Sequence, residues 1–300
     1  MHRLYFISVL LLLLNGITLA EQPGQKTFAS PQDASKALFA AVTADNQTEM
    51  LDIFGPDSIE VILTGDGPDD KHSLDQFAAG YSEMHHLGQE PDGTITLYVG
   101  AEAWPFPVPL VSANGVWHFD TEAGEKEILY RRVGENEFEA INVCHALVDA
   151  ENEYYSQRRD GRVQQYAQVL VSDEGQHNGL FWKPSDGEPE SPIGPLVAYA
   201  EGAGDGKSQG YSPFHGYYYR ILSGRAIAPP GSEKSYIVNG NMIGGFAIVA
   251  YPANYRSSGV MTFIVNQTGV IYQKDLGDET VEVASAMTAY APDDTWKEAE

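Results

Sequence analysis

The sequence predicts an α+β protein, in which helices and antiparallel strands form separate runs along the chain. Three observations predict this class. Residues 30–121 read as helices followed by strands with strong turn signals, and residues 122–159 carry one long amphipathic helical pattern. Residues 211–277 then contain four strand-like runs, separated by loops rich in Gly, Asn, Ser and Pro. We therefore expect N-terminal helices on a small antiparallel sheet, then a long helix packed on a four-stranded antiparallel sheet.

Residues 1–20 have the pattern of a secretory signal peptide. A short basic start precedes an apolar run, Leu4–Leu14, and small residues lead up to Ala20. The apolar run is shorter than the roughly 20 residues that a membrane-spanning helix needs. We expect cleavage after about Ala20 and a periplasmic or secreted mature chain. Its one cysteine, Cys144, excludes an intramolecular disulfide.

The composition shifts predict three further segments. Residues 21–121 should form an N-terminal α+β domain, and residues 122–290 a second domain of the long helix plus an antiparallel sheet. Residues 291–300 read as an acidic tail.

The N-terminal helices have clear start and stop signals. Ser30 is a plausible N-cap, with Pro31 at the first helical position, and Asp45-Asn46 should break the helix before a second one that ends at Gly55. Residues 64–73 read as a turn-rich loop. A third helix is expected over 73–88, capped by Ser73.

Strands are expected next. Residues 94–100 alternate apolar and polar side chains, and 103–111 carry prolines at alternate positions, which predicts an edge strand or an extended segment. Asn114-Gly115 is a strong hairpin signal before the returning strand 116–120. This order of helices and strands is similar to that of the cone-shaped, nuclear-transport-factor-like proteins.

The second half starts with the long helix, for which the periodicity predicts an apolar stripe. The stripe comprises Ile141, Cys144, Val148 and Tyr155, with Leu147 and Tyr154 at its flanks. Four strands should follow, at 214–222, 244–252, 260–266 and 270–276, the last two joined by a tight hairpin at 266–269.

Several stretches carry a resemblance to a known family over residues 27–277. They are FASPQDASKAL, WPFPVPLV, GVWHFDTEAGEKEILYRRVGENE, NGLFWK, PFHGYYYRIL and MIGGFAIVAYPANYRSSGVMTFIVNQTGVIYQKDLG. The chain resembles an uncharacterised bacterial exported family, domain of unknown function number 2950. This resemblance implies export and brings no activity.

A second resemblance covers residues 136–277. The order ENEFEAINVCHALVDAENEYYSQ, YAQVLVSDEGQHNGLFW, YYYRIL and FAIVAYPANYRSSGVMTFIVNQTGVIY is similar to that of a type IV pilin-like or pseudopilin head. The resemblance implies a long helix on a four-stranded sheet. Pilins carry the apolar half of that helix at the mature N-terminus, whereas here the helix follows a whole domain and its first half is charged. We therefore expect the head fold to serve as a soluble module.

The charge of the chain excludes nucleic acid as a partner. With 42 acidic and 18 basic residues the formal net charge is −24, which repels nucleic-acid phosphates and anionic lipid surfaces. The acidic residues are scattered, as on an ordinary solvated surface.

Aromatic residues give the candidate ligand-binding positions. In a strand, Tyr217 and Tyr219 share one face, and an exposed face beside His215 could stack on a ligand, although a structural role is favoured. Trp104 and Trp117 belong to an aromatic group with Phe106 and Phe119, which reads as core or as a ligand groove. The candidate ligand-binding residues are thus His215, Tyr217, Tyr219, Trp104 and Trp117.

The sequence contains no complete motif for a metal site, a cofactor site or a catalytic site. His85 and His86 are adjacent in the expected helix, so their side chains diverge by about 100°. The acidic loop with Asp66, Asp69 and Asp70 lacks the closing Glu of a calcium loop, and Gly202–Ser208 has Glu201 where a phosphate-binding loop needs glycine. We expect no metal site, no cofactor and no catalytic residue, and a buried, inert Cys144.

Two functions remain. The favoured hypothesis is an exported, non-enzymatic interaction or envelope-associated module, with an envelope protein or a small ligand as its partner. The alternative is a small-molecule-binding or hydrolase-like protein that uses an aromatic pocket of the N-terminal domain. His85, His86 or His118 would act there with a nearby Asp.

Overall fold

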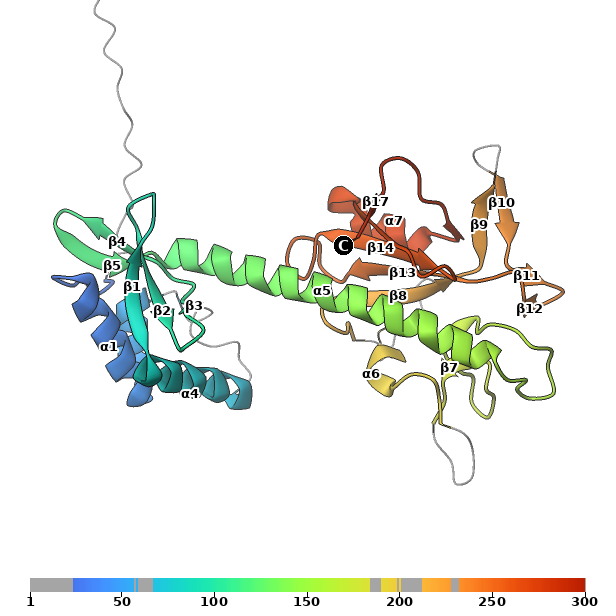
Figure 1. Cartoon of the computed structure of the whole chain (residues 1–300), viewed down its shortest axis with the longest axis horizontal. Coiled ribbons are helices and arrows are strands. Elements are labelled where there is room, and N and C mark those ends of the chain that lie inside the picture. Colours follow the sequence, from blue (N-terminus) through green and yellow to red (C-terminus); the bar gives the residue numbers. More distant parts are fainter. Residues whose placement is uncertain are drawn as a thin grey trace, which may run out of the picture. The chain divides into compact units, whose positions relative to one another are not determined.

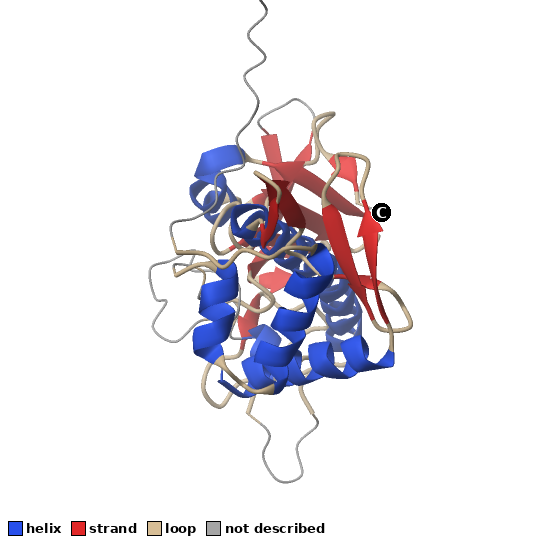
Figure 2. Cartoon of the chain, turned by 90° about the vertical axis from the view of Figure 1, so that its left-hand side faces the viewer, coloured by secondary structure: helices blue, strands red, loops and turns tan. Residues whose placement is uncertain are grey.

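The computed structural model describes residues 24–56, 58, 67–183, 190–198, 200, 212–227 and 232–299 (Figure 1). Helices and antiparallel sheets both occur throughout, so the protein is α+β, as the sequence predicts (Figure 2). The chain divides into two compact units, Met1–Ile128 (unit 1) and Leu129–Glu300 (unit 2). Separate clusters of buried side chains form their cores.

Capping residues set the helix boundaries at the start of unit 1. Helix α1 spans Pro31–Thr43, and the Ser30 side chain accepts a hydrogen bond from the Asp33 amide. Helix α2 spans Gln47–Phe54, and Asn46 caps it in the same way through the Glu49 amide. The predicted start at Ser30, the break at Asp45-Asn46 and the end at Gly55 are therefore confirmed.

The third helix differs from its prediction at both ends. Helix α4 spans Gly67–Glu83, so it begins within the expected loop and Ser73 lies inside it. Asp70 lies near its start, where an acidic side chain suits the positive end of the helix dipole. The residues His85–Gln89 form strand β1, so the prediction of a helix over 73–88 is wrong beyond Glu83.

Strand β1 belongs to the antiparallel sheet of unit 1, whose order is β1-β2-β4-β5 with β3 paired to β2. Asn114 and Gly115 both have positive φ, 54° and 83°, and make the two-residue turn of the predicted β4–β5 hairpin. The helices bury a cluster that includes Leu38, Ile53 and Phe119 against this sheet. The strand bounds are Ile95–Val99 for β2, Trp104–Pro105 for β3, Leu110–Ala113 for β4 and Val116–Phe119 for β5.

The long predicted helix is continuous. Helix α5 spans Thr121–Tyr155, 35 residues, and Gly134 does not interrupt it. Its buried stripe lies to one side of the predicted one, because Leu147 and Tyr154 are fully buried whereas Ile141 and Tyr155 are half-buried. The positions of α5 that are buried most are therefore set by how the helix packs on the sheet, and the periodicity of its sequence does not determine them alone.

The four predicted strands form the main sheet of unit 2, whose antiparallel order is β17-β15-β14-β13-β8. The fifth strand, β17, lies in the last ten residues, so the segment expected as an acidic tail takes part in the sheet. The Gly269 amide donates to the Asn266 carbonyl in the predicted β14–β15 hairpin. The bounds are Tyr217–Leu222 for β8, Ala247–Pro252 for β13, Met261–Asn266 for β14, Ile271–Asp275 for β15 and Lys297–Glu298 for β17.

Helices cover the sheet of unit 2 on both faces. Tyr217 and Tyr219 are fully buried in the core that α5 completes. Arg220 points to the opposite face, where its guanidinium donates to the carbonyls of Ala284 and Met287, 2.9 and 2.5 Å away. These carbonyls lie at the end of helix α7, Thr280–Ala286, where a cation suits the helix dipole. The alternation predicted for the tyrosine run is therefore confirmed.

Shorter elements complete unit 2 (Figure 1). Strands β6 and β7 pair in parallel, β9 pairs with β10 and β16, and β11 pairs with β12. Their bounds are Val169–Val171 (β6), Gly179–Phe181 (β7), Gly224–Ile227 (β9), Ser232–Ser235 (β10), Ile237–Val238 (β11), Asn241–Met242 (β12) and Ala289–Tyr290 (β16), with helix α6 at Pro195–Ala198 and a 3-10 turn at Gly277–Glu279.

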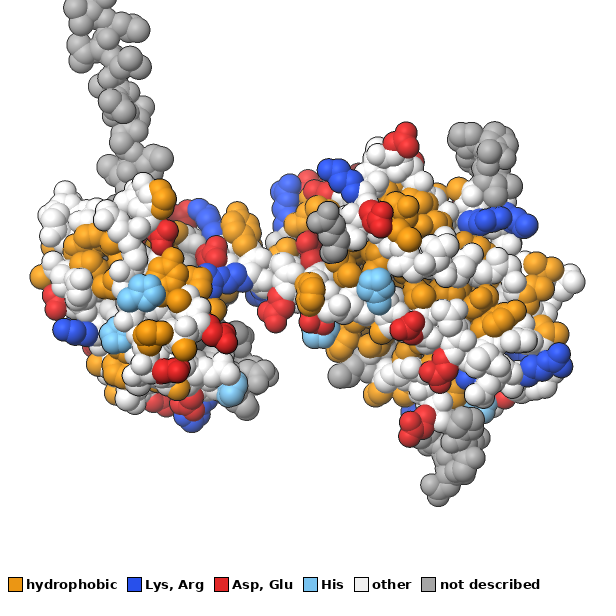
Figure 3. Space-filling model, viewed as in Figure 1, with side chains coloured by type: hydrophobic (Ala, Val, Ile, Leu, Met, Phe, Trp, Pro, Cys, Tyr) orange, Lys and Arg blue, Asp and Glu red, His pale blue; other side chains and the backbone are white. Residues whose placement is uncertain are grey.

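Charged side chains are dispersed over the visible face of both units and form no large single-sign area (Figure 3). Among the described residues, no helix combines the length and the apolarity needed to cross a bilayer.

One acidic side chain lies inside the core of unit 2. Glu151 on α5 is 0% exposed; its Oε2 accepts from the Ala167 amide at 2.8 Å, and its Oε1 has no hydrogen-bond partner. Burial raises the pKa of this carboxyl well above its ordinary value of 4.5. An acid whose pKa is raised by folding favours the folded state less and less as the pH climbs above its unfolded pKa.

We therefore expect Glu151→Gln to stabilise the protein at pH 7. The expected gain is about 1 kcal/mol, which shifts the melting temperature by roughly 2–4 °C in a chain of this size. Thermal unfolding followed by circular dichroism from pH 4 to pH 8 checks this, and the gain should vanish near pH 4. Glu153→Gln, an exposed neighbour with the same charge change, is the control. Equal melting temperatures for the wild type and Glu151→Gln at pH 7 would contradict the prediction.

Two glycines of unit 2 should respond in opposite directions. A Cβ on Gly259 would lie 2.2 Å from the Tyr217 hydroxyl, which is held by a hydrogen bond to the Met261 carbonyl. Gly134 lies on α5 with open space around its Cβ position. Gly259→Ala should cost about 1–3 kcal/mol through overpacking. Gly134→Ala should gain about 0.5–1 kcal/mol by restricting the unfolded chain. Urea unfolding measures both, and a stable Gly259→Ala protein would show that the Tyr217 ring moves aside freely.

Candidate functional site

The two tyrosines singled out in the sequence are core residues. Tyr217 and Tyr219 are each 0% exposed, and their hydroxyls donate to the carbonyls of Met261 (2.9 Å) and Phe214 (3.4 Å). Burial raises the pKa of both phenols, so they stay protonated. These side chains therefore stabilise the sheet and offer no surface to a ligand.

The other three candidates are dispersed. His215 is exposed in the turn before β8, at φ 49°, with its ring edge-on to Phe214. Trp104 and Trp117 belong to unit 1, where Trp104 is 48% exposed and Trp117 is half-buried against the core. Of the five, the structure brings together only Tyr217 and Tyr219.

Three histidines of unit 1 pack against or among other side chains. His85 stacks on Tyr81 with ring centroids 3.7 Å apart, and His86 stacks on Tyr98 at 4.8 Å. Both lie in strand β1, so the helical geometry expected for them is wrong. His118 is buried, 2% exposed, in strand β5. The alternative hypothesis places a histidine and a carboxylate together in the N-terminal domain. Among the described residues, the hydrogen-bonded histidine–carboxylate pair lies in unit 2.

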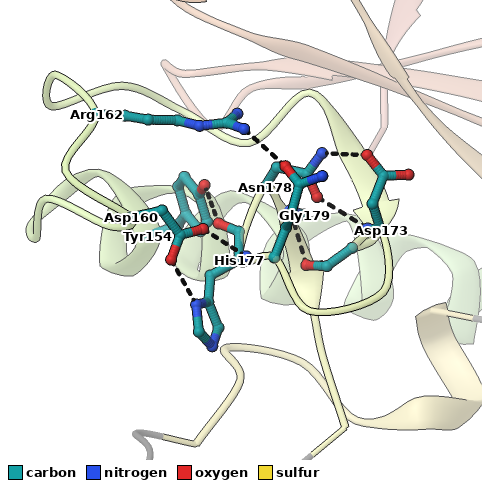
Figure 4. A network of polar contacts seen from close by, with 9 residues as sticks. Tyr154, Asp160, Arg162, Asp173, His177, Asn178 and Gly179 are labelled. Carbon is teal, nitrogen blue, oxygen red and sulfur yellow. Dashed lines mark hydrogen bonds and ion pairs between the residues drawn. The ribbon is translucent and has the colours of Figure 1, made fainter.

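That pair is Asp160 and His177. Asp160 follows the end of α5, and His177 lies in the loop between β6 and β7. One Asp160 oxygen is 2.8 Å from the His177 Nδ1, and the other accepts from the His177 amide at 2.7 Å (Figure 4). Both hydrogen bonds lower the pKa of the Asp160 carboxyl. Its two oxygens thus hold one residue in place.

A network of hydrogen bonds fixes the surrounding loop (Figure 4). The Tyr154 hydroxyl donates to the His177 carbonyl at 2.6 Å, so the end of α5 holds the loop directly. Arg162 donates to Gln176 at 2.7 Å. Asp173 and Asn178 exchange two hydrogen bonds, one from the Asp173 amide and one to its carboxylate. The loop is therefore preorganised by side chains from both of its ends.

A half-open hollow of about 200 Å³ lies beside this network. We call it the arginine hollow; its lining residues are Gln157, Arg158, Arg159, Asp160, His177 and Trp182. The guanidinium carbon of Arg159 lies over two aromatic rings, 4.7 Å from the Tyr154 centroid and 5.2 Å from that of Trp182. Its Nε atom is buried without a hydrogen-bond partner.

Neither Arg158 nor Arg159 takes part in an ion pair among the described residues. Sequence analysis missed this site because its residues come from two distant segments, RRD at 158–160 and HNGLFW at 177–182. The available signal was an arginine pair just past the end of a long helix in a strongly acidic chain.

Other candidate chemistry is absent or buried. Cys144 is 0% exposed, and burial raises the pKa of its thiol to about 12, which confirms the predicted buried, unreactive cysteine. Within the part of the chain that the structure describes, no three His, Cys, Asp or Glu side chains gather into a group that could hold a metal ion. Asp66 and the loop 202–210 lie outside the described residues, and Asp69 and Asp70 belong to α4.

The comparisons identify the family. The family described as "Protein of unknown function (DUF2950)" matches residues 25–299, and the chain belongs to it. Comparisons with curated proteins and with solved structures gave no match. The pilin-like resemblance of the second half therefore stays a prediction.

The Asp160–His177 pair should contribute stability that depends on pH. An acid whose pKa is lowered by folding stabilises the fold above its ordinary pKa, here 3.8, and loses this contribution as the pH falls through its folded value. Asp160→Asn should cost about 1 kcal/mol at pH 7, after discounting for partial exposure. Asn accepts the positive φ of 50° at this position, so the backbone is unchanged.

Urea unfolding at pH 7 and at pH 3 checks this prediction, and the difference from the wild type should shrink at the lower pH. Asp149→Asn, at an exposed position of α5, is the control. A deficit that is the same at both pH values would show that the charge of Asp160 is not what stabilises the loop.

Proposed function

We propose that the protein is an exported, non-enzymatic binding protein and that a small molecule binds at the arginine hollow. The observation that carries the proposal is the pair Arg158 and Arg159. Both line a hollow, and neither forms an ion pair with a carboxylate among the residues that the structure describes, in a chain of net charge −24. A surface this acidic offers many possible ion-pair partners, so cations left without one point to an external ligand.

The roles of the reactive side chains support binding and not turnover. The hydroxyls of Tyr217 and Tyr219 donate to backbone carbonyls, the thiol of Cys144 is buried, and both oxygens of Asp160 are engaged by His177. Such satisfied groups stabilise a fold and rarely act as nucleophiles or general bases. In the arginine hollow, the groups best suited to contact a ligand are guanidinium donors, which bind without reacting.

Export is supported by the leader pattern of residues 1–20, which lie outside the described residues. We expect the full chain, expressed in a Gram-negative bacterium, to appear in the periplasmic fraction with its N-terminus near Glu21. Intact-mass spectrometry of the fractions measures this. Leu12→Arg breaks the apolar run and should leave the uncleaved chain in the cells. A wild-type chain that keeps Met1 and stays in the cytoplasm would refute the proposed export.

Binding at the arginine hollow can be tested without knowing the ligand. The purified protein is mixed with the small-molecule fraction of an envelope extract, washed, and examined by native mass spectrometry. We expect an adduct that Arg158→Gln loses and that Arg132→Gln, a control at an exposed position of α5, retains. The released molecule should be chemically unchanged. No adduct at all, or an adduct equally abundant in both variants, would overturn the site, and consumption of a compound would overturn the non-enzymatic role.

A further inference from the structure

We infer that the arginine hollow recognises an oxyanion, a carboxylate or phosphate group carried by its ligand. This inference rests on the proposed function, because it names the chemistry of the ligand at the same site. Its basis is the local charge, the fixed position of one guanidinium, the size of the hollow and the covered faces of its aromatic ring.

The local charge is opposite to that of the whole chain. Arg158 and Arg159 contribute two positive charges to the lining, and Asp160 contributes one negative charge that is hydrogen-bonded to His177. The hollow is thus net positive within a protein of net charge −24. A cationic ligand would meet two guanidinium groups there, whereas an anion would be attracted at short range and could approach through a partly desolvated opening.

The second argument is the fixed position of Arg159. Its guanidinium lies over the rings of Tyr154 and Trp182, and these contacts use none of its N–H donors. An arginine stacked in this way has already lost much of its conformational entropy, so it loses little more on binding. Its donors lie in a plane, which matches the paired oxygens of a carboxylate or phosphate. Arg158 is exposed and can add a second contact from the rim.

The third argument is size. About 200 Å³ is below the roughly 300–1,000 Å³ of pockets that enclose a whole drug-sized ligand. The hollow is also half open, so it suits an acidic head group whose remaining atoms stay outside. Enclosure of an entire metabolite is not required for binding of this kind.

A neutral aromatic ligand fits less well. Trp182 is only 5% exposed, Arg159 lies over its ring, and His177 meets it edge-on with centroids 4.8 Å apart. The indole therefore has little free face on which another ring could stack. The aromatic side chains of the hollow support the arginine and do not themselves form a binding platform.

The experiment compares ligands that differ in charge alone. Benzoate and benzamide have nearly the same shape, so their binding to the whole mature protein, measured by titration calorimetry or NMR, isolates the contribution of the oxyanion. Phenyl phosphate and inorganic phosphate extend the series to the second anion class. We expect benzoate to bind at least tenfold more tightly than benzamide, and its affinity to fall as salt is added.

Variants locate the effect. Arg158→Gln is an exposed change that should leave folding intact, and it should weaken benzoate or phosphate binding at least fivefold. Arg132→Gln, which removes the same charge elsewhere on the chain, should change the affinity less than twofold. Equal losses in the two variants would mean that only the overall field is sensed, and this would overturn the inference.

The remaining outcomes separate the inference from the proposed function. Equal binding of benzoate and benzamide, abolished by Arg158→Gln, would refute oxyanion recognition and leave the binding site in place. If an adduct from the envelope extract depends on Arg158 but no anion of the series binds, the oxyanion inference fails alone. If neither the extract nor any probe binds in an Arg158-dependent way, the proposed site itself is refuted.

Discussion

Unit 2 depends on the packing of helix α5 against the face of its sheet that carries Tyr217 and Tyr219. The buried half of the helix supplies side chains from Ala140 to Tyr154 to one continuous core. Polar side chains of the same helix hold the chain beyond the sheet: Glu137 accepts from the amides of Val260 and Met261, and Tyr154 holds the loop that carries His177. Because α5 fixes both the core and these loops, the arginine hollow at its end has a rigid support.

The parts of this fold that could be predicted from sequence are those that local chemistry determines. Ser30 and Asn46 cap helices through their own side chains, Asn114-Gly115 adopts the positive φ angles of a tight turn, and the tyrosine run alternates between faces. The prediction was wrong at His85 and His86, where pairing with another strand determines the secondary structure. These two residues continue a helical pattern, but they pair in register with β2, and this tertiary context overrides the local helical preference.

The candidate site was harder to predict for a related reason. The dense aromatic run made Tyr217 and Tyr219 candidate ligand-binding residues. In the strand, however, both side chains point to the same face of the sheet, and that face is buried. The residues of the arginine hollow have no common period or motif. They meet because the chain turns at Asp160, where φ is positive, and because strands β6 and β7 return the segment with His177 and Trp182 to the end of α5. Only the three-dimensional path of this loop brings them together.

Arg159, which we propose to be a ligand-binding residue, is held differently from an arginine with a structural role. Arg220 shows the structural case, since its guanidinium donates to carbonyls at the end of α7. Arg159 lies instead over the faces of two aromatic rings. Stacking fixes the position of a guanidinium while leaving its in-plane donors unused, whereas an ion pair would use them. In a chain with 42 acidic residues, support by aromatic rings is the arrangement that the proposed binding of an anion requires, because it does not neutralise the guanidinium. The same arrangement explains why the hollow can be positive on a protein whose overall field is negative.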